Sequence, residues 1–256
     1  MNSIERVLGA LTFGKAGTPD RVPVLPVPLM QGALVHDCTA RDYFQMPAEK
    51  LADAQIALNE MLDGIPDGVA GFPHVVEDVT GFGVPLKYDY ENSSPTVGGM
   101  LIRDFSDLDT FSAPDPASSP DLCKTLDVIR LLRRRIGDEK VVIGAAIAPF
   151  SLPSMLMGTA KWMRLLYSDE LRSRYFDRVM DVCSRFVISW AKAQQAAGAH
   201  VVVLADGMAS ATIIPRRMFS KYAAPVTKRP IGAIGGLVAY EPVGVIEPFV
   251  ELTGDL

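Results

Sequence analysis

Continuous apolar runs alternate with helical repeats in the second half of the chain. Runs of Val, Ile and Ala without polar interruption are typical of parallel strands that helices cover on both faces. The predicted strands are 140–146, 200–204 and 237–240, and the predicted helices are 152–166, 169–197, 216–222 and 245–252. Strands that alternate with helices imply parallel βαβ units, so the pattern predicts an α/β fold.

The first half of the chain is more irregular. Ser3 is placed to cap an N-terminal helix whose apolar face includes Val7 and Leu11. Proline and glycine positions and apolar spacing predict the remaining elements. These are helices at 47–62 and 122–132, a short strand at 68–72, an antiparallel excursion within 84–102 and a loop at 112–120.

We expect the whole chain, residues 1–256, to form one domain. The predicted βα units are too few for a closed eight-stranded barrel, and the last helix, 245–252, carries apolar residues that need a sheet beneath them. The architecture is therefore expected to be incomplete at the C-terminus. Unless the chain continues beyond Leu256, we expect self-association through this edge, as a homodimer or as aggregates.

Charge and hydropathy narrow the classes of partner. The chain carries 25 Lys and Arg against 30 Asp and Glu, and its dense basic run, 133–135, lies at the end of a predicted helix. Cations there complement the helix dipole, so the pattern does not favour nucleic-acid binding. No apolar run reaches the roughly 18 residues that span a bilayer, and residues 1–6 lack a signal-peptide pattern.

The cysteines indicate a reducing compartment. Cys38, Cys123 and Cys183 are far apart in the sequence, which excludes the short spacing of a zinc knuckle or a redox motif. We therefore expect a cytoplasmic protein. Cys183 also shares a helical stripe with Phe186 and Trp190, which predicts a core position for it.

Asp206 is the leading candidate for a site residue. It follows the apolar strand 200–204 and opens a Gly/Ser loop that contains Ser210. Ligands of α/β folds bind at the carboxyl ends of parallel strands, which favours a functional role for Asp206. An Asp after a strand also serves as a turn former or as a helix cap, so both interpretations stay open.

His74 is a second candidate. It follows the short strand 68–72 and has carboxylates three and four residues later, the first of them Glu77. His74 and Glu77 can therefore orient a substrate or exchange a proton with it. A polar helix start with an acidic residue in its first turn explains the same pattern, and this structural alternative is the stronger. His36 fits a surface role and His200 a structural role.

Several stretches together resemble the uroporphyrinogen decarboxylase superfamily, and more closely its cobamide-dependent methyltransferase branch. Each stretch alone is weak evidence for this superfamily, whereas the order and spacing of all of them over almost the whole chain are specific for it. They are 4–11, 19–24, 47–55, 144–152, 194–199 and 206–210. The resemblance implies a (β/α)8 TIM-type barrel with an N-terminal helical extension and a pocket at the carboxyl ends of the strands.

The resemblance also implies a chemistry. Members of the methyltransferase branch move a methyl group between a corrinoid protein and a thiol or similar acceptor. In the thiol-activating members, a His-x-Cys pair after a late strand and a further Cys hold zinc. Here Glu241 stands at the His position and Val243 at the Cys position, and 244–256 contains no Cys. Valine cannot bind a metal, so a thiolate zinc site is not expected.

The decarboxylase branch is an alternative. Its members grip the carboxylates of a porphyrinogen with arginines near the first strand, and an acidic residue stabilises the pyrrole cation. The matching segment here, 28–37, contains no arginine, so this chain lacks the anion clamp.

The resulting hypothesis is a corrinoid-linked methyltransferase that moves a methyl group between methylcobamide on a corrinoid protein and a small acceptor such as tetrahydrofolate or a thiol. Asp206 and Glu241 are expected to orient the acceptor and handle its proton, with no bound metal. The expected substrate-binding residues are His74, Glu77, Tyr240 and Ser210. A uroporphyrinogen decarboxylase-like enzyme and a non-catalytic barrel that binds a small molecule remain as alternatives.

Overall fold

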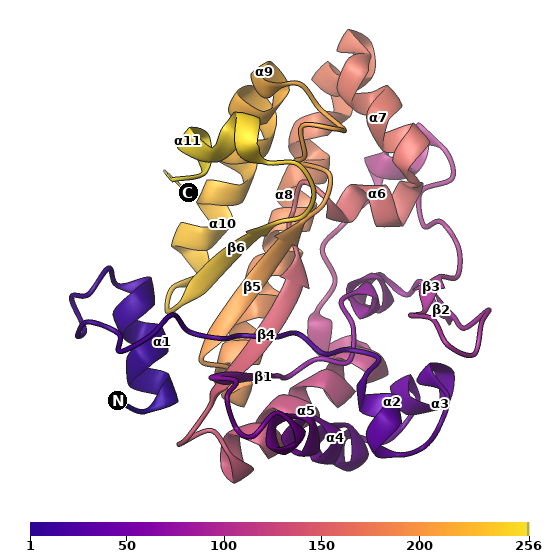
Figure 1. Cartoon of the computed structure of the whole chain (residues 1–256). Helices are drawn as coiled ribbons and strands as arrows, with labels where there is room; N and C mark the ends of the chain where they lie inside the picture. The colour runs from indigo at the N-terminus through magenta and orange to yellow at the C-terminus, as the bar shows by residue number, and fades with distance from the viewer. Residues whose placement is uncertain (255) are drawn as a thin grey trace.

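Four parallel strands form the main sheet of the computed structural model, which describes residues 1–254 and 256 (Figure 1). In spatial order they are β1 (Gly68–Ala70), β4 (Val141–Ile147), β5 (Val201–Asp206) and β6 (Val238–Pro242). The predicted α/β architecture with parallel strands is confirmed. Within the described residues β6 pairs only with β5, so the sheet is open and has four strands where a closed barrel of this type has eight.

Helices cover one face of this sheet. Val142 and Leu204 point to that face and lie in one core with Val187 and Trp190, which belong to the predicted stripe of the long helix. Cys183 of the same stripe is fully buried, as expected. The covering helices are α4 (Ala48–Met61), α5 (Pro120–Arg135), α8 (Asp169–Ala197) and α10 (Ala224–Ile234).

The N-terminal extension lies on the opposite face. Helix α1 (Ser3–Leu11) places Val7 in a second apolar cluster with Val141 and Val201, which begin their strands. The extension therefore covers the amino end of this inner face and leaves the carboxyl end open (Figure 1). The cap of α1 differs from the prediction, because the side chain of Asn2, not Ser3, accepts the N–H of Glu5 at 2.8 Å.

Two ion pairs to one buried carboxylate anchor the extension to the sheet. Asp67, immediately before β1, is fully buried, and its carboxylate lies 2.5 Å from Arg6 of α1 and 2.7 Å from Arg21. The same carboxylate accepts the backbone N–H of Val24 at 2.9 Å. Two short helices, α2 (Gly32–Val35) and α3 (Ala40–Phe44), complete the extension.

The segment between β1 and β4 contains the predicted antiparallel excursion. It consists of the two-stranded pair β2 (Leu86–Lys87) and β3 (Thr96–Val97), and the pairing is antiparallel. The same segment between β1 and β4 contains three 3-10 turns. They are η1 (Val76–Phe82), η2 (Phe105–Asp109) and η3 (Pro116–Ser118).

Three predicted helices differ from the observed ones. The helix expected at 152–166 is two, α6 (Leu152–Met157) and α7 (Thr159–Tyr167), because Gly158 adopts a φ of 84° between them. The helix expected at 216–222 continues through the π-helical turn η4 into α10 and ends only at Ile234. The helix expected at 245–252 is a 3-10 turn followed by one helical turn. The bounds are α9 (Arg216–Met218), η4 (Phe219–Ala223), η5 (Glu247–Phe249) and α11 (Val250–Thr253).

In the part of the chain that the structure describes, none of the helices combines the length and the apolar character needed to cross a membrane.

Candidate active site

The loops that follow the four parallel strands form a rim at the carboxyl end of the sheet (Figure 1). In folds of this class the rim is where ligands bind. Buried carboxylates fix the rim, while one exposed carboxylate faces the open side. The residues that matter are Asp78, Ser151, Asp206 and Glu241.

Asp206 lies at the end of β5, where it was predicted, but its side chain is fully buried on the helix-covered face. Ser151 donates its hydroxyl hydrogen to one carboxylate oxygen. Tyr240 and Thr227 donate to the other, at 3.3 and 3.5 Å. Helix α9, which follows, has Pro215 at its N-cap, so Asp206 is not the cap of this helix.

Burial dominates the electrostatics of this cluster. It raises the pKa of Asp206 above the ordinary value of a carboxyl group, although the hydroxyl donors oppose the shift. Burial, followed by the charge of Asp206, raises the pKa of Tyr240 as well. The Ser151 hydroxyl also accepts the N–H of Met208 at 2.8 Å, so the cluster joins the loops after β4 and β5. Asp206 and Tyr240 are thus brought together, and Asp206 does not reach solvent.

Glu241 occupies the opposite face. Neighbouring side chains of a strand alternate between faces, so Glu241 points away from Tyr240 and toward the inner side that Ala239 shares with the α1 cluster. It is exposed and pairs in register with Ala205 of β5. Among residues 1–254 and 256, Glu241 forms no ion pair or hydrogen bond through its carboxylate, which is therefore free for a ligand.

His74 and Glu77 were predicted as substrate-binding residues, and the structure places them in contact with each other inside the protein. Nδ1 of His74 lies 2.5 Å from a carboxylate oxygen of Glu77, and the two side chains are 4% and 3% exposed. The other oxygen of Glu77 accepts the hydroxyl of Thr125 at 3.1 Å. The Phe44 ring packs edge-on against the His74 ring at 5.2 Å between centroids. This pair therefore lies beneath α3 and α5 and not on the open rim.

Asp78 is a structural residue that the sequence did not single out. One of its oxygens accepts the backbone N–H of Ile147 at 2.6 Å, and the other accepts the indole N–H of Trp190 at 3.0 Å. Burial, and next the charge of Glu77, raise the pKa of Asp78 well above its ordinary value. A buried tryptophan N–H needs an acceptor, and this requirement was the available signal. Asp78 fixes the end of β4.

Gln194 completes the edge of β4 beyond the end of β1. Its side-chain amide accepts the N–H of Ala145 and donates to the carbonyl of Ala145, both at 2.8 Å. A Cβ at Gly144 would lie 2.4 Å from the Gln194 oxygen, so the close approach requires glycine. Gln194 and Asp78 thus replace the ladder partners that the short β1 cannot supply.

Ser210 fastens the last two loops of the rim. Its hydroxyl accepts the N–H of Val245 at 3.1 Å, and the adjacent Ala211 N–H donates to the carbonyl of Val245 at 2.8 Å. The N–H of Val243 donates to the carbonyl of Asp206 at 3.1 Å. Ser210 is 3% exposed, so it joins loops and faces no open pocket.

His200 has the structural role that the sequence favoured. Its Nδ1 accepts the backbone N–H of Val142 at 2.9 Å, and burial, followed by the charge of Arg133, lowers the pKa of the imidazole. It lies at the amino end of β5, away from the rim.

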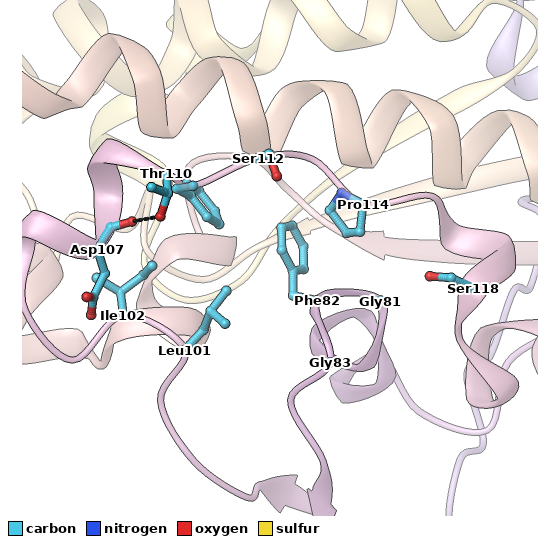
Figure 2. A pocket seen from close by; sticks show the side chains of 11 residues that line it. Gly81, Phe82, Gly83, Leu101, Ile102, Asp107, Thr110, Ser112, Pro114 and Ser118 are labelled. Atoms are coloured by element: carbon cyan, nitrogen blue, oxygen red, sulfur yellow. Dashed lines mark hydrogen bonds between the residues drawn. The ribbon is translucent and has the colours of Figure 1, made fainter.

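The largest described cavity, of about 520 Å³, has none of the candidate residues in its lining, which Figure 2 shows. Its one carboxylate, Asp107, accepts the backbone N–H groups of Arg103 and Asp104 at 2.8 and 2.9 Å. These hydrogen bonds lower the pKa of Asp107, which leaves no free acid or base in the cavity. The lining residues are Gly81, Phe82, Gly83, Leu101, Ile102, Asp107, Thr110, Phe111, Ser112, Pro114 and Ser118.

The donor set on the rim does not fit the thiolate zinc site of the thiol-activating branch. Within residues 1–254 and 256, no three or more His, Cys, Asp or Glu side chains are placed to hold a metal ion. Glu241 is a single carboxylate, and Val243 offers no donor atom.

The chain is similar to proteins of two activities. Over 153 residues it is 27% identical to the methylcobamide:CoM methyltransferase MtbA of Methanosarcina acetivorans, with 60% of this chain and 44% of that protein covered. Over 180 residues it is 24% identical to a uroporphyrinogen decarboxylase of Microcystis aeruginosa, with 66% and 49% covered. The chain thus spans about half the length of these curated relatives or less.

A solved structure and a family model cover more of the chain. A structure described as a methyltransferase from Methanosarcina mazei superposes on the whole chain with a TM-score of 0.87 at 20% identity, and 74% of that structure is covered. This likeness confirms the fold. The family model for uroporphyrinogen decarboxylase (URO-D) matches residues 4–245. The chain therefore belongs to the uroporphyrinogen decarboxylase family, and the methyltransferase relatives support its resemblance to the cobamide-dependent branch.

Proposed function

We propose that this chain acts in corrinoid-linked methyl transfer between methylcobamide on a corrinoid protein and a small acceptor such as tetrahydrofolate or a thiol. The relatives named as methylcobamide:CoM methyltransferases support the reaction class. The observation that carries the proposal is the position of Glu241. It is a free, exposed carboxylate at the carboxyl end of the open inner face, where a bound acceptor can approach a corrinoid.

The chemistry requires a proton acceptor at this place. The methyl group leaves methylcobamide without the electron pair of its bond, which stays on the corrinoid, and the acceptor supplies the pair for the new bond. The acceptor must therefore lose its proton. In the proposed mechanism Glu241 takes this proton and holds the acceptor by a charge-assisted hydrogen bond. The neighbouring strand residues Ala205 and Ala239 carry no polar side-chain group that would compete with the acceptor for Glu241.

The buried cluster supports this step without contacting the acceptor. Asp206 holds Ser151 and Tyr240, and Tyr240 immediately precedes Glu241 in β6. Asp206 is therefore proposed as a positioning residue. A pterin fits this site better than coenzyme M does, because carboxylates bind ring nitrogens and no thiolate has to be formed on a metal.

The test uses free methylcobalamin as the methyl donor and tetrahydrofolate or a thiol as the acceptor, and follows loss of the methylcobalamin absorbance. Glu241→Gln is expected to lower the acceptor-dependent rate by about 100-fold, as for loss of a positioned general base. Glu139→Gln is the matched control, because Glu139 is an exposed carboxylate at the amino end of the sheet. Equal rates for the two variants would remove Glu241 from the mechanism, and no acceptor-dependent loss with the unmodified chain would refute methyl transfer.

Decarboxylation of a porphyrinogen-like acid is the second candidate, favoured by the match to the Microcystis decarboxylase. Segment 28–37 still offers no arginine for the substrate carboxylates. Release of carbon dioxide from uroporphyrinogen would support this candidate over methyl transfer. Methylcobalamin binding without turnover of either substrate would support a non-catalytic barrel instead.

A further inference from the structure

Positive charge is concentrated on one part of this acidic chain. Residues 159–234 contain 12 Lys and Arg against 5 Asp and Glu, whereas the whole chain has a net charge of −5. This segment forms α7, α8, β5, α9, η4 and α10. An uneven charge distribution of this size creates a local field that attracts anions even when the net charge is negative.

A cavity of about 340 Å³ lies within this basic region, between the α7–α8 junction and the α9–η4 segment. Three cationic side chains line it, and its one acidic side chain, Asp169, is already paired with one of them. Two tyrosine rings and two apolar side chains complete the wall. The lining residues are Leu166, Tyr167, Asp169, Arg172, Arg217, Met218, Lys221 and Tyr222.

Two of the three cations lie over the Tyr222 ring at the wall. The Arg172 guanidinium lies 5.4 Å from the ring centroid and the Lys221 ammonium 5.1 Å. Arg172 is fixed further, because it donates to the carbonyl of Leu166 at 2.6 Å. Neither Lys221 nor Arg217 pairs with an acidic side chain in the part of the chain that the structure describes.

The backbone at this cavity is unusual in an independent way. Lys221 and Tyr222 lie in the π-helical turn η4, between two α-helical segments. Such a turn contains one residue more than an α-helical turn and re-aims the side chains that follow. π-helical turns inside helices are rare and occur frequently at functional sites. This turn places both residues on the cavity wall.

We propose that this cavity binds the phosphate or pyrophosphate group of a soluble small molecule. Arg172, Arg217 and Lys221 supply three cations for a dianionic group, which guanidinium and ammonium donors recognise well. The rings of Tyr167 and Tyr222 leave an aromatic wall for the organic part of the molecule. None of these residues belongs to the rim that carries Glu241, so the site is separate from the proposed methyl-transfer site.

The probe for this site is pyrophosphate, titrated into the chain by calorimetry at constant ionic strength set with chloride. Arg217→Ala and Lys221→Gln are each expected to weaken binding about tenfold or more, since each removes one charge-assisted contact. Lys192→Gln removes the same charge from an exposed position of α8 outside the cavity and should change the affinity less than about twofold. We expect all three variants to fold, because the substituted positions are exposed, and thermal unfolding checks this.

Three results would overturn the proposal. They are no detectable pyrophosphate binding, unchanged affinity in both cavity variants, and an equal loss in Lys192→Gln, which would indicate only diffuse attraction. A parallel sedimentation assay uses vesicles of phosphatidylglycerol, with phosphatidylcholine vesicles as the control. Pyrophosphate binding without sedimentation supports a soluble ligand, whereas charge-dependent sedimentation would assign the basic surface to a lipid headgroup instead.

Discussion

Replacement of Asp206 by Asn or by Ala separates a positioning role from a chemical role. Asn keeps the shape of the side chain and one acceptor oxygen for the Ser151 hydroxyl, and its amide can donate to the oxygens of Thr227 and Tyr240. Ala removes every acceptor. The hydroxyls of Ser151 and Thr227 then stay buried with no partner for their hydrogens.

The structure sets the expected magnitudes. Each buried polar group left without a partner costs about 1–3 kcal/mol, so Asp206→Ala should lower the free energy of unfolding by about 2–5 kcal/mol. Asp206→Asn should change it by less than about 1 kcal/mol at neutral pH, because each hydroxyl keeps one hydrogen bond to this side chain, with Thr227 and Tyr240 now accepting from the amide. Urea denaturation can be followed by the fluorescence of the two tryptophans, Trp162 and Trp190, both of which are buried.

The pH dependence provides an independent check. Burial raises the pKa of Asp206 in the folded state, so the folded state binds the proton more tightly than the unfolded chain does. Relative to Asp206→Asn, the unmodified chain should therefore lose stability as the pH rises from about 4 through the pKa of the folded state. Two results would refute this account of the cluster. One is a difference in the free energy of unfolding between the unmodified chain and Asp206→Asn that stays constant from about pH 4 to 8, and the other is a loss of more than about 2 kcal/mol of that free energy in Asp206→Asn. A 100-fold loss of turnover in Asp206→Asn with unchanged stability would return Asp206 to a direct chemical role.

Three further predictions follow from the buried contacts. Gln194→Leu should lower the free energy of unfolding by about 2–5 kcal/mol, because the N–H and carbonyl of Ala145 lose their partners. Leu at the neighbouring, half-buried Gln195 removes one hydrogen bond to the carbonyl of Gly235 at an exposed site and should cost less than about 1 kcal/mol; similar losses would contradict the edge-completing role of Gln194. Asp67→Asn should cost about 1–3 kcal/mol, because Arg6 and Arg21 lose charge-assisted contacts to the buried carboxylate while Arg6 keeps its ion pair with Asp20. Hydrogen bonds from Val24, Arg6 and Arg21 outweigh burial and lower the pKa of Asp67, so this difference should shrink as the pH falls below about 4; a difference that persists at low pH would refute the ion-pair account. Elemental analysis of the purified chain should find less than about half an equivalent of zinc, and stoichiometric zinc would show that a donor set was missed.

The sequence predicted the parallel sheet because β4 and β5 are buried on both faces over most of their length and therefore consist of continuous apolar runs. The strand expected at 140–146 is observed as Val141–Ile147, and the long helix has the expected bounds. The continuous apolar run before Asp206 also made the orientation of its side chain unpredictable. In 201–204 every residue is apolar, so no alternation indicates which face the next side chain takes.

Local spacing was informative for His74 and Glu77, which lie three residues apart and meet. Their burial was not predictable, because it depends on α3 and α5, which come from distant parts of the sequence. The contact of Asp78 with Trp190 joins residues 112 positions apart. The break at Gly158 and the π-helical turn were missed because a single residue in each case overrides a continuous helical pattern.

Because side chains alternate along β6, two neighbouring residues have different roles. Tyr240 belongs to the buried cluster, and Glu241 is the proposed proton acceptor. Tyr240 turns to the covered face and joins Asp206, so the next residue, Glu241, must turn to the open face. A shift of β6 by one residue would reverse both directions and bury the carboxylate of Glu241 beside that of Asp206. Two buried carboxylates at one place repel each other, so such a shift would remove the exposed base and destabilise the sheet. The contacts of Asp206 and Ser210 with 243–245 hold the register, which gives these buried residues a place in the proposed function although neither reaches the acceptor.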